Sequence, residues 1–149
     1  MILTAENLSM SYDKKLVIDD ISFSLKTGEI TALVGRNGSG KTTILKLLSK
    51  ILDLNVGDIK IEGKSLDKNP ELKVNYVFLP DRFDFFKYDT GMKTMEYYQV
   101  IYPDFNKEFV IREAEKLGLS LKNSIRTFSK GNKALLGLII ALGTNAKFL

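Results

Sequence analysis

The chain has 149 residues and a net charge of +4, with 44% hydrophobic and 27% charged residues, a composition typical of a globular domain. It contains neither cysteine nor histidine, which excludes a disulfide scaffold, a thiolate metal site and the commonest general base. The longest apolar run, over 134–142, is about half of what a membrane-spanning helix requires, and no secretory signal opens the chain, so we expect a cytoplasmic protein.

Two strands are predicted at the start of the chain, over 2–10 and 16–25. In the second, Val17, Ile21 and Phe23 have the spacing of residues in a strand. The segment between them is short and turn-like, which favours an antiparallel pair.

A glycine-rich loop follows a third predicted strand, over 30–34, and leads into a predicted helix over 44–48. It comprises Gly35, Arg36, Asn37, Gly38, Ser39, Gly40, Lys41, Thr42 and Thr43. Its three glycines let the backbone wrap a polyphosphate, so that successive N–H groups point at the phosphate oxygens. The helix adds its positive end, Lys41 is placed to reach the β- and γ-phosphates, and the Thr42 hydroxyl is placed to ligate Mg²⁺. The sequence therefore predicts a phosphate-binding loop.

Later in the chain, strands are predicted over 59–62 and 76–79, and three helices follow. The predicted inward positions recur every three or four residues. They are Met92, Met95, Tyr98, Ile101 and Tyr102 in the first helix, and Phe109, Ile111, Ala114, Leu117 and Leu119 in the second. The last helix is predicted from about Ser129 to Ala141. We expect a strand-rich, nucleotide-binding part over 1–83 and a helical part over 84–149.

Three segments give the whole chain a resemblance to the ATP-binding subunit of ABC transporters. The loop has the family's Gly-x-Asn-Gly-x-Gly-Lys form, and Tyr12 lies 23 residues before Gly35, where the family has an aromatic residue that stacks on adenine. Residues 128–133, Phe-Ser-Lys-Gly-Asn-Lys, are similar to the family's signature motif. The resemblance implies an α/β fold of the P-loop NTPase class and ABC type. Such a fold has an antiparallel β subdomain, part of a parallel core sheet and a helical subdomain.

The resemblance also implies the ligands, which are ATP and Mg²⁺. Lys41 is the implied catalytic residue, and Tyr12 and Val17 join the loop in binding the nucleotide. Ser129 and Gly131 are expected to bind the nucleotide of a neighbouring subunit.

Thr42 and Asp81 are the implied metal ligands. Asp81 stands where the family often has a glutamine that contacts Mg²⁺ and the attacking water. A carboxylate can ligate Mg²⁺ but donates no hydrogen bond when ionised, so a metal ligand and a turn residue both remain open.

The implied partners are a second ATP-binding subunit, identical or different, and an integral-membrane permease. Two subunits are expected to pair head to tail, each ATP lying between one subunit's 35–43 loop and the other's residues 129–132. The aromatic residues between positions 83 and 98 either belong to the core or line a groove for the permease. They are Phe83, Phe85, Phe86, Tyr88, Tyr97 and Tyr98. The resemblance places the protein on the inner face of the cell membrane, and we expect no nucleic-acid partner because basic and acidic residues are mixed.

Family members continue with an apolar strand ending in aspartate, the Walker B strand, and then a glutamate that polarises water. The sequence stops at 147–149, where that strand would begin, so we expect a truncated ATPase domain that binds MgATP but hydrolyses it negligibly alone. The intact subunit is expected to hydrolyse ATP and to drive transport. The alternative is a regulatory module that binds nucleotide without hydrolysis. A small GTPase is disfavoured because its Asn-Lys-x-Asp motif finds only Asn-Lys-Ala-Leu over 132–135. A nucleotide or metabolite kinase is a further, weaker alternative.

Overall fold

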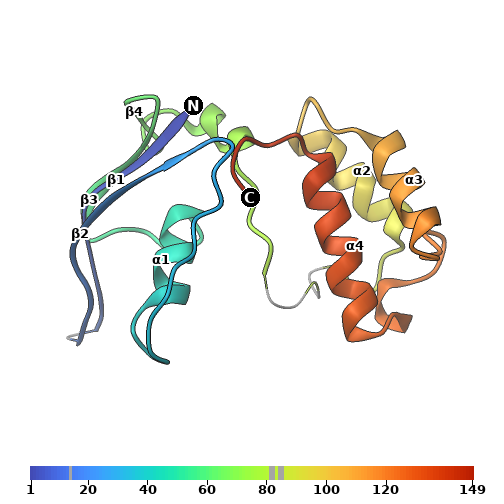
Figure 1. The fold of residues 1–149 in the computed structure, drawn as a ribbon, viewed down its shortest axis with the longest axis horizontal. Helices are drawn as coiled ribbons and strands as arrows, with labels where there is room; N and C mark the ends of the chain where they lie inside the picture. Colours follow the sequence, from blue (N-terminus) through green and yellow to red (C-terminus); the bar gives the residue numbers. More distant parts are fainter. Residues whose placement is uncertain (14, 81–82, 84–85) are drawn as a thin grey trace. The chain divides into compact units, whose positions relative to one another are not determined.

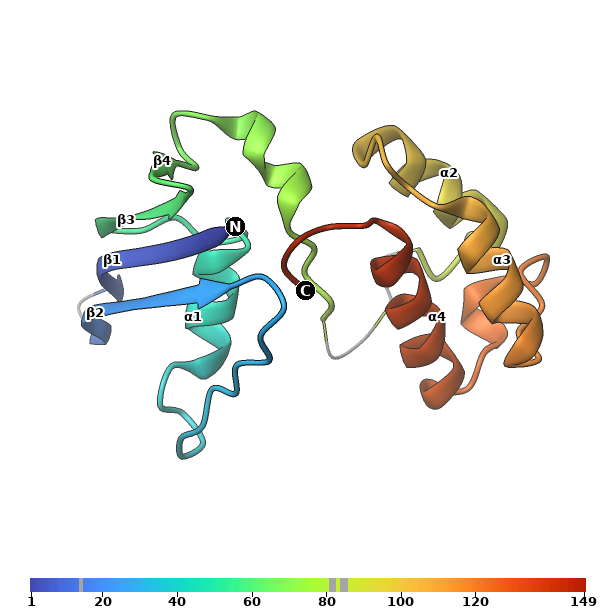
Figure 2. The ribbon, with the colours of Figure 1, turned by 45° about the horizontal axis from the view of Figure 1, so that its top comes forward.

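The computed structural model describes residues 1–13, 15–80, 83 and 86–149, and they form two compact units (Figure 1, Figure 2). The first unit comprises residues 1–73 and the second residues 74–149. In the part of the chain that the structure describes, no helix is long and apolar enough to cross a membrane.

A four-stranded antiparallel sheet forms the first unit. Its strands are β1 (Ile2–Tyr12), β2 (Lys15–Lys26), β3 (Val56–Ile61) and β4 (Lys64–Ser65), in the order β2-β1-β3-β4. The predicted antiparallel pairing of the first two strands is confirmed. One of the two inner strands, β1, buries alternate side chains until a register shift separates Ala5 from Leu8.

This shift keeps the apolar side chains of β1 on the buried face. Asn7 adopts a left-handed backbone, with φ of 49°, inside the irregularity. Opposite it on β3, Gly57 approaches so closely that a Cβ there would lie 2.5 Å from the carbonyl oxygen of Glu6. Only glycine fits here, because the position also has φ of 102°. The bulge thus lets Leu8 and Met10 continue the core that Ala5 began.

The predicted helix after the glycine-rich loop is confirmed as α1 (Lys41–Leu48). It packs against β2 on one face of the sheet (Figure 1). Ile44 and Leu47 are buried on α1, and Ile18 is buried on β2. The glycine-rich loop is therefore anchored by a helix that belongs to the core of this unit.

The strand predicted over 30–34 is not formed. Among the described residues no strand pairs with this run, Ile30 is fully exposed and Val34 is 89% exposed. A continuous apolar run is typical of a strand inside a parallel sheet, which needs a partner at each edge for its backbone groups. Apolar content alone supplies no such partner, so the run remains irregular here.

The strand predicted over 76–79 is reduced to one parallel bridge between Tyr76 and Phe148. The amide of Val77 donates to the carbonyl of Phe148 over 3.0 Å. This bridge is the part of the expected parallel sheet that the described residues contain.

The 3₁₀ helix η1 (Pro70–Asn75) spans the boundary between the units, and three α-helices build the second. They are α2 (Gly91–Ile101), α3 (Lys107–Lys116) and α4 (Lys130–Gly143), with a 3₁₀ turn, η2 (Ile125–Thr127), before α4. All three predicted helices are confirmed. Each begins after a capping side chain: Thr90 accepts from the amide of Lys93, Asn106 from that of Phe109 and Ser129 from that of Asn132.

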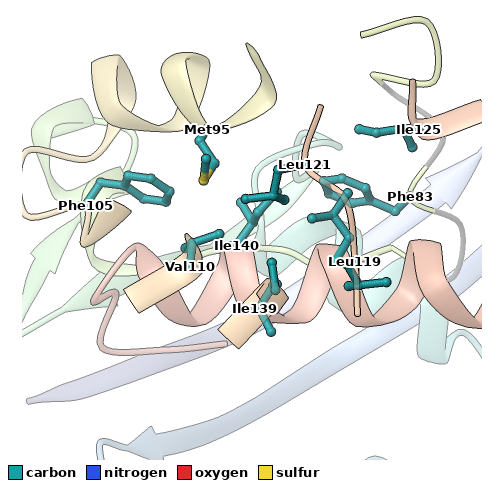
Figure 3. Packing of buried hydrophobic residues seen from close by; sticks show 11 residues of the cluster. Phe83, Met95, Phe105, Val110, Leu119, Leu121, Ile125, Ile139 and Ile140 are labelled. Atoms are coloured by element: carbon teal, nitrogen blue, oxygen red, sulfur yellow. The ribbon is translucent and has the colours of Figure 1, made fainter. Parts of the chain in front are cut away.

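These helices enclose an apolar core (Figure 3). Met95, Val110 and Ile140 are completely buried in it. Val110 was not among the predicted inward positions. It is buried because α4 has glycine at position 143, where a Cβ would overlap the Cγ2 atom of Val110. The core of this unit therefore depends on a close contact between α3 and α4.

Two predicted inward positions are wrong. Ile101 is 58% exposed and Leu117 is 45% exposed. Ile101 is the last residue of α2, and Leu117 is the residue that caps α3. At both positions the helix ends, so the helical spacing no longer predicts which residues face the core.

The aromatic residues of this unit fall into two groups. Phe83 is buried, so the core interpretation holds for this residue. The Phe86 ring lies 5.3 Å from that of Tyr97, centroid to centroid. Burial also raises the pKa of Tyr98 to about 12. Tyr88, in contrast, is 74% exposed, and Phe85 lies outside the described residues.

We predict that Gly143→Ala destabilises the second unit, because the added methyl group meets Val110 and lies 3.2 Å from the Phe105 ring. Overpacking of this kind costs roughly 1–3 kcal/mol. Gly131→Ala is the matched control in the same helix, where the added group meets only the Ser129 hydroxyl at 3.9 Å. Urea unfolding would measure both, and equal stability of the two variants would contradict the tight contact.

Candidate functional site

The glycine-rich loop lies against β2. Gly38 and Gly40 have left-handed backbones, with φ of 81° and 92°. At Gly40, which caps α1, a Cβ would lie 2.7 Å from Cδ1 of Ile18 and 3.3 Å from the carbonyl oxygen of Val17. Glycine therefore serves both the turn and the close approach to the sheet.

The ammonium group of Lys41 is held over the start of the loop. Its Nζ donates hydrogen bonds of 2.8 Å to the carbonyl oxygens of Gly35 and Arg36. The amide of Ser39 also donates to Arg36, over 3.2 Å. A Cβ at Gly35 would lie 2.7 Å from Oγ of Ser39. These contacts close the loop into a tight turn with a cation at its edge.

Several amides of the loop are free to donate. Those of Gly38, Gly40 and Lys41 have no acceptor within the described part of the chain. They precede the first intrahelical bond, which the amide of Ile44 donates to the carbonyl of Gly40 over 2.9 Å. Free amides at a helix start carry partial positive charge, and Lys41 adds a full one. The arrangement suits an anion with several oxygens.

The two threonines after the lysine differ in their surroundings. Thr42 is exposed in the first turn of α1, whereas Thr43 is buried against the unit's core. Only the Thr42 hydroxyl is therefore free to meet a ligand. Within the described residues, no group of three or more acidic, cysteine or histidine side chains could hold a metal ion. Asp81 lies outside the described residues.

Two predicted site residues lie on the β1–β2 hairpin. Val17 is brought to the loop, because its carbonyl faces Gly40. Tyr12 is exposed at the end of β1, opposite Lys15, and no described contact joins its ring to the loop. Sequence reasoning missed Ile18, which packs on Gly40. Its apolar type indicates burial, but its partner is decided by tertiary contact.

Ser129 and Gly131 lie at the start of α4, in the second unit. Oγ of Ser129 accepts from the amide of Asn132 over 3.1 Å, and its own hydrogen remains available to a ligand. A Cβ at Gly131 would meet open space apart from the Ser129 hydroxyl. An anion could therefore approach this backbone closely.

The family model described as "ABC transporter" matches residues 18–149 of the chain. A relative from Bacillus subtilis, "ABC transporter ATP-binding protein YtrB", is 30% identical over 140 residues, which are 94% of this chain and 48% of that protein. The chain thus spans about half the length of this relative.

Solved structures show the same fold. A putative ABC transporter ATP-binding protein from Pyrococcus furiosus matches with a TM-score of 0.80 and 28% identity, over 98% of this chain and 72% of that one. A structure titled "Structure of ATP binding subunit of ABC transporter" matches with a TM-score of 0.83 and 24% identity, over 98% of this chain and 63% of that one. The expected fold class is confirmed by these neighbours.

We predict that Gly40→Ala destabilises the first unit by roughly 1–3 kcal/mol, because the methyl group adds a clash with Ile18 to the backbone strain. Gly38→Ala is the matched control. It has a similar φ but nothing within 4 Å of the added group, so it should cost clearly less. Thermal unfolding followed by circular dichroism would compare the two, and a Gly38 variant as unstable as the Gly40 variant would contradict the role of the β2 contact.

Proposed function

The chain belongs to the ABC transporter family, and on this premise we propose that its 35–43 loop binds the triphosphate of MgATP. The observation that carries the proposal is the Lys41 ammonium, held 2.8 Å from two loop carbonyls, beside free amides at the start of α1. A triphosphate tail supplies the several oxygens that such donors require. Gly35, Gly38 and Gly40 let the backbone approach that tail.

The residues present fit a magnesium ion bound mainly through the nucleotide. Mg²⁺ is usually held by one or two protein oxygens together with phosphates and water. The exposed Thr42 hydroxyl supplies one such oxygen, next to Lys41. In this proposal Asp81 is a second candidate ligand. When bound, the ion neutralises phosphate charge.

The nucleobase is assigned to the β1–β2 hairpin. Val17 adjoins the loop, and the exposed Tyr12 ring offers a flat apolar surface on which a base can stack. Stacking recognises every base by its face, so this contact should distinguish ATP from GTP only weakly. Arg36, Asn37, Ser39 and Thr43 complete the proposed binding loop.

We further propose that the protein acts as a pair of ATP-binding subunits. Ser129 and Gly131 would then meet the nucleotide of the second subunit, through a hydroxyl and exposed amides at the start of α4. The partner subunit is identical or related. A head-to-tail pair is closed by symmetry, because each subunit offers both surfaces.

The proposed task of the pair is to power a membrane permease from the cytoplasmic face. Relatives named for transport systems support it: one from Haemophilus influenzae is named "Lipopolysaccharide export system ATP-binding protein LptB". Another structural neighbour is described as part of the ABC transporter complex cbiONQ. The division of labour between residues 1–83 and 84–149 belongs to the same proposal.

Lys41 is the proposed catalytic residue. Phosphoryl transfer depends on positioning and on stabilising the charge that spreads over the phosphate oxygens. The Lys41 ammonium and the loop amides supply both effects at the β- and γ-phosphates. The resemblance assigns the activation of water to a glutamate that is not among these 149 residues. The intact subunit is therefore the proposed ATPase, and this chain is the part that binds.

We predict that Lys41→Ala lowers MgATP affinity at least about tenfold, since a charge-assisted contact to phosphate is worth roughly 1.5–3 kcal/mol. Lys46→Ala removes one ammonium group from the other end of the same helix and should bind like the wild type. Isothermal titration calorimetry of the three proteins measures the difference. Equal affinity of the wild type and the Lys41 variant would refute the proposed site.

We also predict that the 149-residue chain releases phosphate from MgATP at no more than the background rate, although it binds the nucleotide. The physical reason is that the glutamate which the resemblance assigns as general base for the attacking water is not among these residues. A coupled phosphate-release assay checks this, with Lys41→Ala as the control for contaminating ATPases. Turnover that disappears in the control would show that the chain supplies its own general base.

A further inference from the structure

The glycine-rich loop contains a pair of residues whose chemistry goes beyond nucleotide binding. Asn37 is followed by Gly38, and this is the one Asn-Gly pair among the 149 residues. The backbone nitrogen that follows an asparagine can attack its side-chain carbonyl carbon and close a five-membered succinimide ring. Glycine hinders this attack least, because it has no Cβ and its backbone rotates most freely. The sequence therefore places its most reactive asparagine within the candidate site.

Asn37 and Gly38 are the two central residues of a β-turn. The amide of Ser39 donates to the carbonyl of Arg36 over 3.2 Å and closes the turn. The φ of Gly38 is 81° and that of Asn37 is not positive, which is the combination of a type II turn. The hydrogen bond of such a turn joins its outer residues and leaves the central peptide unpaired. The amide of Gly38 accordingly has no acceptor in the described part of the chain, so the attacking nitrogen is free.

The side chain of Asn37 is also free to react. It is exposed, and no described residue forms a hydrogen bond with it. The side-chain amides of Asn7 and Asn69, in contrast, each donate a hydrogen bond of 2.8 Å, and that of Asn145 donates one of 2.7 Å. A Cβ built at Gly38 meets nothing within 4 Å. The peptide between Asn37 and Gly38 therefore has room to rotate toward the side chain.

We propose that Asn37 is a site of spontaneous deamidation, and that this reaction inactivates the phosphate-binding loop. The amide nitrogen of Gly38 loses its proton to hydroxide and attacks Cγ of Asn37. The new bond from nitrogen to Cγ replaces the bond from Cγ to Nδ2, which takes up a proton and leaves as ammonia. Water then opens the ring at either carbonyl and gives aspartate or isoaspartate. The overall reaction consumes water, releases ammonia and changes no oxidation state.

Both products place a carboxylate in the loop. The net charge of the chain falls by one from +4. The new charge lies next to Arg36, whose carbonyl shares the Lys41 ammonium with that of Gly35. A negative charge at this position repels a triphosphate and competes with it for the ammonium group. Isoaspartate also lengthens the backbone inside a tight turn. The loss of nucleotide affinity rests on the proposed function, whereas the reaction itself does not.

A bound nucleotide should protect Asn37. The attack requires the peptide before Gly38 to rotate out of the turn. A triphosphate held by the loop amides binds the turn as it stands, so it lowers the population of the rotated conformer. The loop therefore deamidates mainly while it is empty.

The test incubates the wild type and Gly38→Ala in warm, mildly alkaline buffer and measures deamidation at each asparagine by peptide mass spectrometry. Asn123 is the internal control, because it is exposed and followed by serine. We expect Asn37 to react at least about tenfold faster than Asn123, and Gly38→Ala to remove this difference. Equal rates at Asn37 and Asn123, or a rate at Asn37 that Gly38→Ala leaves unchanged, would overturn the proposal. Circular dichroism verifies that the variant is folded.

A second arm measures the consequence by calorimetry with MgATP. Asn37→Asp carries the charge of the product, and Asn37→Ser is its neutral control. We expect the dissociation constant of Asn37→Asp to exceed that of Asn37→Ser at least about tenfold, and aged wild type, separated by ion exchange, to resemble Asn37→Asp. Equal affinities of the two variants would contradict inactivation by charge.

The same proteins separate this proposal from the proposed function. Saturating MgATP should slow deamidation of the wild type at Asn37 several-fold and leave the rate at Asn123 unchanged. If MgATP binds and the rate at Asn37 stays the same, protection by the nucleotide is refuted. If fresh wild type binds no MgATP, the proposed function is refuted, and rapid deamidation at Asn37 still stands.

Discussion

The close approach of Gly40 to β2 is the constraint on which the candidate site depends. A helix can present free amides to an anion only if its first turn is held in place. Here the missing side chain of Gly40 lets the loop touch Ile18 and the carbonyl of Val17, while Ile44 and Leu47 fix the following helix in the core. The loop geometry is thus a consequence of packing between α1 and the sheet. This geometry in turn positions Lys41.

In the second unit, too, a glycine permits a close contact, here between two helices. The side chain of Val110 on α3 packs directly on Gly143 of α4, where a Cβ would overlap it. This contact buries Val110, a position of α3 that periodicity did not identify. It also anchors the far end of α4, the helix whose start carries Ser129 and Gly131. The candidate binding turn of this unit therefore leads into a helix that belongs to the unit's core.

The loop of residues 35–43 brings one ammonium group and several free amides together in one turn. Lys41 donates to the carbonyls of Gly35 and Arg36, and the amides of Gly38, Gly40 and Lys41 have no acceptor in the part of the chain that the structure describes. This arrangement suits the compact charge of a triphosphate.

The sequence by itself determined the loop, the three helices of the second unit with their caps, and the first antiparallel pair. These features follow from local rules: glycine at left-handed positions, capping side chains at Thr90, Asn106 and Ser129, and periodic apolar residues. Tertiary structure alone decided whether the apolar run over 30–34 became a strand, because a strand needs a partner for its backbone hydrogen bonds. It also decided the contacts of Ile18 and Val110, since residues far apart in sequence meet only through the packing of the whole unit.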